Sequence, residues 1–379
     1  MSDALFVVID GEEYSQWSEY DIDSDLMVDA DSWSLRVDNF WEGDVGLFRK
    51  GALAEVYVNG WLQLVGVIED TDYANSKDSG SVASIGGRSL AGLLVDSSPM
   101  PGRFANRTFI QVCEDLCAPF GIEVVVTDPA RARATGRPGA ARGTAQVDQV
   151  LSRTGIPLDD LRTQTGDTVW GFLAGIAERL ELAIWMTPDG KLAVARPAYD
   201  AQPQFSLTRA RYGSPQRASN NVIDGNLRES IAERYSTITG VGQATVNERK
   251  TYFAGTPNEY SFDIPRQVSF TYAGTDEEMA RVLHKPLRQS YNVPTRVKLE
   301  EAVEADIRRR RFESYEVEYV VAGHSQNGTI WQPDTTVAVY DEVLNIDEVL
   351  YCTGRRFTRS RDGGTRTQLR LRKRGIWLA

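Results

Sequence analysis

Two pairs of acidic residues have a spacing that could support hydrolysis. Glu42 and Asp44 lie next to Trp41, and Asp341 adjoins Glu342. A glycosidase needs two carboxyl groups about 5–9 Å apart on either side of the scissile bond. Acids in such stretches are far more often solvated loop side chains, so we interpret both pairs as structural. The sequence predicts no catalytic residue and no enzymatic activity.

Thiols and imidazoles are the side chains that could bind a metal. Cys113 and Cys117 lie four residues apart in an expected helix, Cys352 lies in an expected strand, and the two histidines are His284 and His324. Two histidines are too few to complete a zinc site with these thiols. An odd cysteine count without a regular framework favours reduced, buried thiols and folding in a cytoplasm. We therefore predict no metal site and no cofactor.

Motifs of nucleotide and acyl chemistry are missing from the sequence. The segment Gly86-Gly87-Arg88-Ser89 lacks the lysine of a phosphate-binding loop, and no Gly-x-Ser-x-Gly elbow occurs. The eight tryptophans could serve as sugar platforms, but core or interface anchors are the commoner role. The chain is thus expected to pack and to contact partners. A tail-associated cell-wall hydrolase and a host-receptor or carbohydrate-binding β module remain the alternatives.

The C-terminal segment has the pattern of a β-barrel. From residue 315 onward, β-branched and aromatic residues alternate with polar ones, with turn sequences at Asn327-Gly328 and Asp362-Gly363. Asn-Gly and Asp-Gly between alternating strands are the strongest short-range signal of a hairpin. Strands are expected at 337–340, 349–354 and 368–371.

A similar pattern occurs near the N-terminus. The sequence predicts a hairpin over 54–68 with Asn59-Gly60 at its tip, preceded and followed by further strands. Those strands are expected at 5–10, 18–22, 32–39 and 81–86, with a short helix at 90–95. One strand plan occurring twice would give two similar antiparallel barrels in one chain; chance similarity is the alternative.

The middle of the chain mixes helices and strands. Thr108 is a plausible N-cap for a helix over 109–117, and Asp167 or Thr168 for a helix over 169–180. Further helices are expected at 277–283 and 299–312, and a hairpin at 182–195. Residues 128–146 predict an exposed loop, and residues 245–290 are polar and weakly patterned. The fold class is therefore α+β and β-rich.

Charge is distributed unevenly along the chain. The net charge is −11, but residues 1–100 hold 19 acids and 5 bases, whereas residues 353–379 hold 9 bases and 1 acid. The acidic part is unsuited to gripping a phosphate backbone. The C-terminal arginines alternate with strand residues, which indicates either a solvated face or an electrostatic contact with an acidic partner surface.

Length and hydropathy limit the class of protein. A chain of 379 residues favours two to four domains. No apolar run reaches the roughly 18 residues of a membrane span. The first ten residues lack the basic region of a signal peptide, so we expect neither a signal peptide nor a membrane anchor.

Six short motifs in a characteristic order carry a resemblance to a known family. They are Gly66-Val67-Ile68, Ile85-Gly86-Gly87-Arg88-Ser89-Leu90, Gly166-Asp167-Thr168-Val169-Trp170, Pro188-Asp189-Gly190-Lys191-Leu192, Asn221-Val222-Ile223 and Gly328-Thr329-Ile330-Trp331-Gln332-Pro333. Together they span nearly the whole chain. The sequence resembles the baseplate hub proteins of contractile-tailed bacteriophages, the late control D or gene P-like tail proteins of Mu-like phages.

The resemblance implies a fold and an assembly. It implies two barrel-like tube domains per chain, at 1–98 and at 205–245 plus 313–379. A mixed domain at 99–204 would lie between them, with 246–312 as a candidate for its completion. It also implies a homotrimeric ring of pseudo-six-fold symmetry that joins the hexameric tail tube to the trimeric central spike, contacts other baseplate proteins and lets DNA pass without binding it.

The resemblance also implies a location and a role for the charged segments. The protein is expected in the tail baseplate of the virion, assembled in the host cytoplasm; the hub of a phage-derived secretion machine is a related possibility. A ring of identical chains uses a heterologous interface. We therefore expect some acids to line the channel or to meet arginines of a neighbouring chain. The acids are Asp21, Asp23, Asp25, Asp29 and Asp31, and the arginines are Arg355, Arg356, Arg359 and Arg361.

Overall fold

The fold comes from a computed structural model that describes residues 3–38, 48–77, 80–126, 161–180, 182–253, 259–291, 293 and 295–374. The chain divides into two compact units. The first comprises Met1–Asn226 and Val317–Leu371, and the second Leu227–Glu316 and Arg372–Ala379. This division into two units does not test the three domains expected from the sequence. The boundaries of those domains therefore stay predictions.

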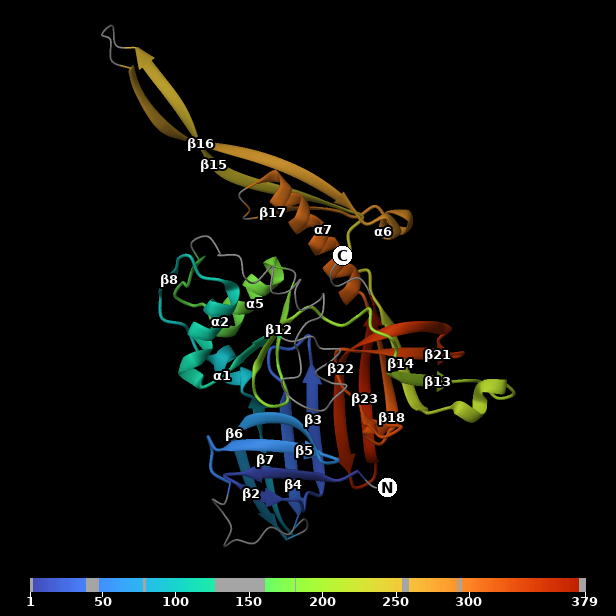
Figure 1. Cartoon of the computed structure of the whole chain (residues 1–379). Coiled ribbons are helices and arrows are strands. Elements are labelled where there is room, and N and C mark those ends of the chain that lie inside the picture. Colours follow the sequence, from blue (N-terminus) through green and yellow to red (C-terminus); the bar gives the residue numbers. More distant parts are fainter. Residues whose placement is uncertain are drawn as a thin grey trace. The chain divides into compact units, whose positions relative to one another are not determined.

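Most of the first unit is one 13-stranded sheet (Figure 1). Its N-terminal strands are β1 (Leu5–Ile9), β2 (Glu12–Tyr14), β3 (Glu19–Asp25), β4 (Ser32–Asp38), β5 (Leu53–Val58), β6 (Trp61–Ser76) and β7 (Gly80–Ser89). Its C-terminal strands are β13 (Phe205–Arg209), β14 (Val222–Glu229), β18 (Tyr315–Ala322), β21 (Thr335–Asp341), β22 (Ile346–Ser360) and β23 (Gly364–Lys373). We call these two groups the N-terminal and the C-terminal β module.

The two modules share one strand order. In the N-terminal module the neighbours run β3-β4-β7-β6-β5-β1, and in the C-terminal module they run β14-β18-β23-β22-β21-β13. Each position in the first order has a counterpart in the second, and both long hairpins leave three residues between their strands. The strand plan expected from the sequence is therefore present twice.

The modules also differ from the expected barrels. The strands β1 and β5 pair antiparallel, whereas their counterparts β13 and β21 pair parallel. The strand order of the sheet runs from β14 to β2, with a branch from β22 through β21 that ends at β13, so among the described strands neither module closes into a hydrogen-bonded barrel. The hairpin tips follow the sequence prediction, because Asn59 and Asn327 adopt positive φ angles of 53° and 52° before a glycine.

A small α/β layer occupies residues 91–195. It contains α1 (Ala91–Asp96), β8 (Arg103–Phe104), α2 (Phe109–Cys117), the 3₁₀ helix η2 (Ala118–Phe120), β9 (Val124–Val126), β10 (Leu161–Arg162), α5 (Val169–Arg179), β11 (Ala183–Met186) and β12 (Leu192–Ala195). Its helices begin where the caps predict. Thr108 forms a capping box with Gln111, and the Thr168 side chain accepts from the Gly171 amide. Apolar side chains of α1, α2 and α5, the α-helices described in this layer, share one core with β11 and β12.

The second unit is built on a long hairpin. Strands β15 (Thr237–Phe253) and β16 (Glu259–Thr275) pair along their whole length, and β17 (Pro286–Tyr291) lies parallel to the start of β15. Helices α6 (Glu277–Val282) and α7 (Arg296–Glu313) complete the unit. A Cβ on Gly240 would lie 2.5 Å from Val303 Cγ2, so a glycine is required where α7 packs on the hairpin.

Most predicted elements are present, with two departures. The helix expected over 299–312 is α7, and the helix expected over 277–283 is α6. Residues 245–290, in which the weak pattern predicted no strand, belong largely to β15 and β16. The strand expected over 349–354 is much longer, as β22. The predicted loop over 128–146 lies outside the described residues. Short elements complete the fold: β19 (Ser325–Gln326), β20 (Thr329–Ile330) and η3 (Pro215–Ser219).

Candidate assembly interface

The two β modules join along one pair of strands. Strand β3 pairs antiparallel with the second half of β22, with Asp25 opposite Gly354, Ile22 opposite Phe357 and Tyr20 opposite Arg359. We call this contact the seam. The inward side chains of β3 alternate with outward ones, so Tyr20 and Ile22 are buried while the intervening acids reach the other face. The seam makes one sheet of two modules.

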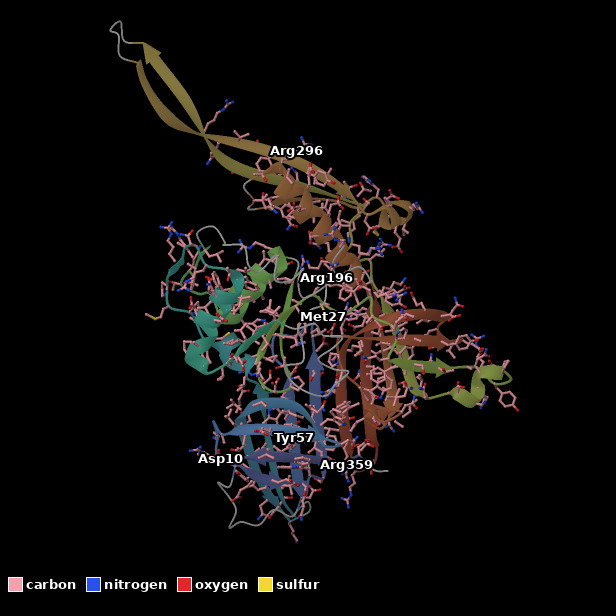
Figure 2. The ribbon with its side chains drawn as sticks, in the orientation of Figure 1. Asp10, Met27, Tyr57, Arg196, Arg296 and Arg359 are labelled. Atoms are coloured by element: carbon pink, nitrogen blue, oxygen red, sulfur yellow. The ribbon has the colours of Figure 1, made fainter. Side chains whose placement is uncertain are left out.

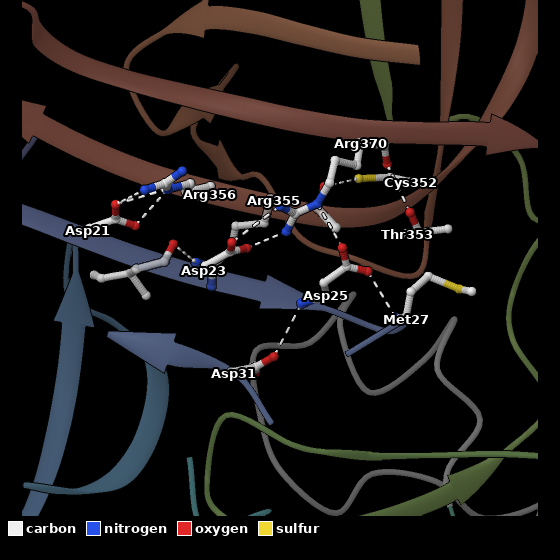
Figure 3. Close-up of polar contacts among 12 residues, drawn as sticks. Asp21, Asp23, Asp25, Met27, Asp31, Cys352, Thr353, Arg355, Arg356 and Arg370 are labelled. Atoms are coloured by element: carbon white, nitrogen blue, oxygen red, sulfur yellow. Dashed lines mark hydrogen bonds and ion pairs between the residues drawn. The ribbon is translucent and has the colours of Figure 1, made fainter. Parts of the chain in front are cut away.

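Acids of β3 pair with arginines of the C-terminal module on the outward face of the seam (Figure 3). Arg356 Nε donates to both carboxylate oxygens of Asp21 at 2.9 Å. Arg370 lies between two acids, with Nη1 3.2 Å from Asp23 Oδ2 and Nε 2.7 Å from Asp25 Oδ2. The hydrogen bond to Asp21 raises the pKa of Arg356. The three aspartates of β3 therefore each have a cationic partner in their own chain.

Arg355 lies on the inward face and is 2% exposed. Its Nη2 donates to Gln63 Oε1 at 2.7 Å, and its guanidinium carbon lies 3.9 Å from the centre of the Phe357 ring. Burial lowers the pKa of Arg355 to about 10, which the nearby Asp31 carboxylate partly opposes. Burial raises the pKa of Asp31 to about 6, which Arg355 in turn opposes. The buried Arg355 and the partly buried Asp31 thus have opposite charges, and each favours the charged form of the other.

His324 connects three elements behind the seam. Its Nε2 lies 2.8 Å from Tyr20 Oη, its Nδ1 lies 3.0 Å from Thr367 Oγ1, and its ring lies 4.4 Å from the Phe357 ring. The side chain is fully buried, and burial lowers its pKa to about 4. A neutral imidazole that both accepts and donates therefore ties β3 to the C-terminal module.

Three of the predicted charged residues, Asp29, Arg359 and Arg361, take no part in the ion pairs of the seam. Asp29 Oδ1 accepts a hydrogen bond from Trp170 Nε1 at 2.8 Å. Arg359 lies where N-terminal and C-terminal strands meet (Figure 2), and Arg361 is exposed in the β22–β23 loop. Neither arginine makes an ion pair with another described residue. The predicted role of all nine charged residues in a channel or between chains stays a prediction.

The catalytic alternatives gain no geometric support. Asp341 accepts from Tyr319 Oη at 2.9 Å, and Glu342 accepts from Arg211 N at 2.7 Å and Ser214 Oγ at 2.6 Å. Both carboxylates are therefore engaged in holding the C-terminal module together. Glu42 and Asp44 lie outside the described residues.

Thiols and carboxylates offer no metal centre in the described part of the chain. Cys113, Cys117 and Cys352 are free and buried, and burial raises the pKa of Cys113 and raises that of Cys117 to about 12. Cys113 and Cys117 therefore stay protonated near neutral pH. None of the described helices has the length and apolar content to cross a membrane.

Sequence reasoning missed two residues of the seam. Arg370 was not singled out, although it holds both Asp23 and Asp25. Its position between the buried Leu369 and Leu371 of β23 gave it the ordinary pattern of an outward-facing strand residue. His324 was interpreted only as structural, without its partners. A signal for the seam was present in the opposite charges of the two segments, but that signal does not specify which strands pair.

Family comparisons match both β modules. Residues 4–89 match the family described as Mu phage baseplate assembly protein GpP-like, N-terminal, and residues 309–376 match a family described as tail protein, C-terminal domain. A search among curated proteins found no match. The two matched segments contain β3 and β22, the strands that form the seam.

Solved structures extend the likeness over the whole chain. The tail protein from Neisseria meningitidis MC58 is 26% identical, with 100% of this chain and 98% of that chain covered and a TM-score of 0.76. The prophage MuSo2 tail protein from Shewanella oneidensis is 20% identical, with full coverage of both chains and the same TM-score. The E. coli c3393 protein, a component of the type VI secretion system, is 10% identical, with 98% and 78% covered and a TM-score of 0.52.

The expected resemblance to Mu-like baseplate proteins is thereby confirmed, since the family match and the full-length structural likeness agree. Segments of both modules match tail-protein families and the whole chain shares its fold with two solved tail proteins, so the chain is similar to structural proteins of phage tails and baseplates, including the Mu GpP-like baseplate assembly proteins.

Proposed function

We propose that the protein is the hub of the baseplate, a homotrimeric ring with pseudo-six-fold symmetry. The observation that carries the proposal is the repeated strand order of the two β modules within one continuous sheet. Three chains with two similar modules each would present six similar units around an axis. Such a ring could seat a hexameric tail tube on one side and a trimeric spike on the other.

The proposed ring encloses a conduit through which DNA passes without being held. Duplex DNA carries about one charge per 1.7 Å of its axis, so a basic bore would retain the genome. The proposal assigns Asp21, Asp23, Asp25, Asp29 and Asp31 to the bore or to contacts with a neighbouring chain. Asp21, Asp23 and Asp25 have arginine partners within the chain. Of the five acids, Asp29 has the most exposed side chain.

The proposed role is structural and non-enzymatic. The acids considered for hydrolysis that the structure describes, Asp341 and Glu342, accept hydrogen bonds from neighbouring strands and loops. A peptidoglycan zymogram tests this part directly, and a cleared band would contradict it. The fold of the E. coli secretion component favours a second candidate, the hub of a phage-derived secretion machine. Neighbouring tail genes of a phage would distinguish the two.

Mass in solution is the test of the ring. Multi-angle light scattering of the purified chain should give three times the chain mass of 42.2 kDa, independent of dilution over the micromolar range. A mass of one or two chains at every concentration would contradict the trimer. A control measurement with the tail tube protein added should shift the trimer peak without changing the number of hub chains in it.

A further inference from the structure

Three neighbouring strands of the N-terminal β module present apolar side chains on their outward side. Strands β6, β5 and β1 are consecutive in the sheet, and their inward side chains are buried. Leu53 is 55% exposed, and the rings of Phe6 and Tyr57 stack with their centres 4.6 Å apart. Six outward residues, which we call the apolar face, are Phe6, Val8, Leu53, Tyr57, Leu62 and Val67.

The apolar face departs from the pattern of the other strands. In the C-terminal module, β13 is the counterpart of β1 and has Ser206 and Thr208 at its outward positions. A sheet face that meets water is usually polar, and a contiguous apolar one marks a surface that another molecule covers. On β3 and β4 of the N-terminal module itself, the outward residues are Glu19, Asp21, Asp23, Ser32, Ser34 and Arg36.

One carboxylate lies within the apolar face. Glu55 lies opposite Val8, and its Oε2 accepts a hydrogen bond from Tyr57 Oη at 2.7 Å. It makes no ion pair with another described residue, whereas Asp10, just after β1, lies 3.7 Å from Arg49. An apolar cover alone would take water from the Glu55 carboxylate without giving it a partner. A molecule that covers this face must therefore supply both apolar surface and a cation.

The loop between β13 and β14 carries this combination of side chains. Tyr212 is 91% exposed, and the Arg217 guanidinium carbon lies 4.7 Å from the centre of the Tyr212 ring. Arg217 makes no ion pair with another described residue. Residues 210–221, which we call the Tyr212 loop, contain two arginines and no acid. The loop, with its 3₁₀ helix η3, projects from the C-terminal module (Figure 1).

Hydrogen bonds hold the Tyr212 loop in one conformation. Glu342 accepts from the Arg211 amide at 2.7 Å and, through its other oxygen, from Ser214 Oγ at 2.6 Å. Asn220 Oδ1 accepts from the Ala210 amide at 2.8 Å across the base of the loop. An ordered loop loses little conformational entropy when it binds, and tyrosine and arginine are the side chains that contribute most at interfaces. The loop is therefore suited to binding another molecule.

We propose that the Tyr212 loop of one copy binds the apolar face of the next copy. The inference rests on the proposed ring and names the surfaces that hold its chains together. In the bound pair, Tyr212 packs against Leu53 and Phe6, and Arg217 pairs with Glu55. Since Tyr212 is 91% exposed, it does not cover the face of its own chain. Each copy gives its loop and receives another on a different surface, which is a heterologous contact that can close into a ring.

A second copy is the occupant that the two surfaces favour. Glu55 lacks a cation and Arg217 lacks an anion among the described residues, and each surface also exposes apolar side chains that the other can cover. A ring of three chains with two modules each sets every N-terminal module beside the C-terminal module of another copy. The proposed ring therefore brings the module with the apolar face next to the module with the loop.

A charge exchange tests the contact by light scattering over a dilution series. Glu55→Arg and Arg217→Glu should each raise the concentration at which half of the trimer dissociates by about tenfold or more, and the double variant should recover most of that loss. Asp72→Arg on β6 and Arg228→Glu on β14 are matched controls, because both side chains are exposed and neither makes an ion pair with another described residue.

The controls should keep the dissociation concentration of the unchanged protein. Trimers that persist unchanged in both single variants would overturn the proposed contact. The same conclusion would follow from a double variant that stays dissociated while folded by circular dichroism, or from controls that dissociate as the single variants do.

Photo-cross-linking separates this contact from the ring itself. p-Benzoyl-phenylalanine in place of Tyr212 keeps an aromatic ring at that position and reacts on illumination with the C–H bonds that it touches. Covalent products of two and three chains should form, with cross-linked peptides from residues 5–9 or 53–67. A trimer by mass that gives no covalent product, or one cross-linked elsewhere, would overturn the contact and leave the ring intact. A chain that remains single at every concentration would overturn both.

Discussion

Asp21 and Arg356 are 335 residues apart in sequence and form an ion pair across the seam, with Arg356 Nε 2.9 Å from both carboxylate oxygens. This contact shows how the acidic N-terminal and basic C-terminal segments are used: their charges meet inside one chain. Neutralising Arg355, Arg356, Arg359 and Arg361 together would therefore weaken the chain's own fold as well as any contact between chains. Tests of assembly need residues outside the seam.

Removing Arg370 should destabilise the first unit. Arg370→Ala leaves the carboxylates of Asp23 and Asp25 close together without their shared cation, and the Asp25 side chain is 9% exposed. We expect a loss of about 2 kcal/mol in the free energy of unfolding, measured by urea titration. Arg361→Ala is the matched control, because its side chain is exposed, and it should stay within about 0.5 kcal/mol. Equal effects of the two variants would contradict the account of the seam.

Gly354 should not tolerate a side chain. A Cβ there would lie 2.7 Å from Asp25 Cγ and from Arg370 Nε, so Gly354→Ala must separate the ion pair. We expect a loss of about 1–3 kcal/mol by the same titration. Gly175→Ala, inside α5 with no heavy atom within 4 Å of the added Cβ, should be neutral or stabilise the chain by up to about 1 kcal/mol. A harmless Gly354→Ala would show that the seam is looser than described.

Asp31 and His324 should contribute opposite pH dependences. The pKa of Asp31 rises from 3.8 to about 6 on folding, so its contribution to stability falls as the pH rises through this window. The pKa of His324 falls from 6.5 to about 4, so its contribution is full above 6.5 and is lost as the pH falls toward 4. Each contribution is on the order of 2–3 kcal/mol, and the two largely cancel.

Single substitutions should separate the pH-dependent contributions of Asp31 and His324 to stability. Asp31→Asn mimics the protonated acid, so the variant should lose more stability than the unchanged protein between pH 7 and pH 4.5. His324→Gln removes the titrating ring, so that variant should gain stability relative to the unchanged protein over the same interval. Thermal midpoints at the two pH values give both differences. Parallel shifts of the two variants would mean that one of these groups is not buried as described.

Local elements could be predicted because their determinants are local. Asn59-Gly60 and Asn327-Gly328 specify hairpin turns, and Thr108 and Thr168 specify helix starts, since each satisfies backbone groups within a few residues. The β15–β16 hairpin was missed because residues 245–290 are polar and lack an Asn-Gly or Asp-Gly turn.

The seam could not be predicted because it depends on contacts between distant strands. From the sequence, an arginine such as Arg355 in a strand is expected at the surface. In the structure it is buried against Phe357 and Gln63. Opposite charges in the two segments indicated attraction, but the sequence did not distinguish contacts within a chain from contacts between chains. Repetition of the strand plan was visible only as a weak similarity of turns.

Averaged electron-microscopy images of the purified protein, viewed along the ring axis, test the central claim most directly. The account predicts a closed ring with threefold symmetry and six lobes of similar size at one radius, two from each chain. A ring with three lobes, or two lobes per chain at clearly different radii, would contradict the claim that one chain supplies two equivalent β modules.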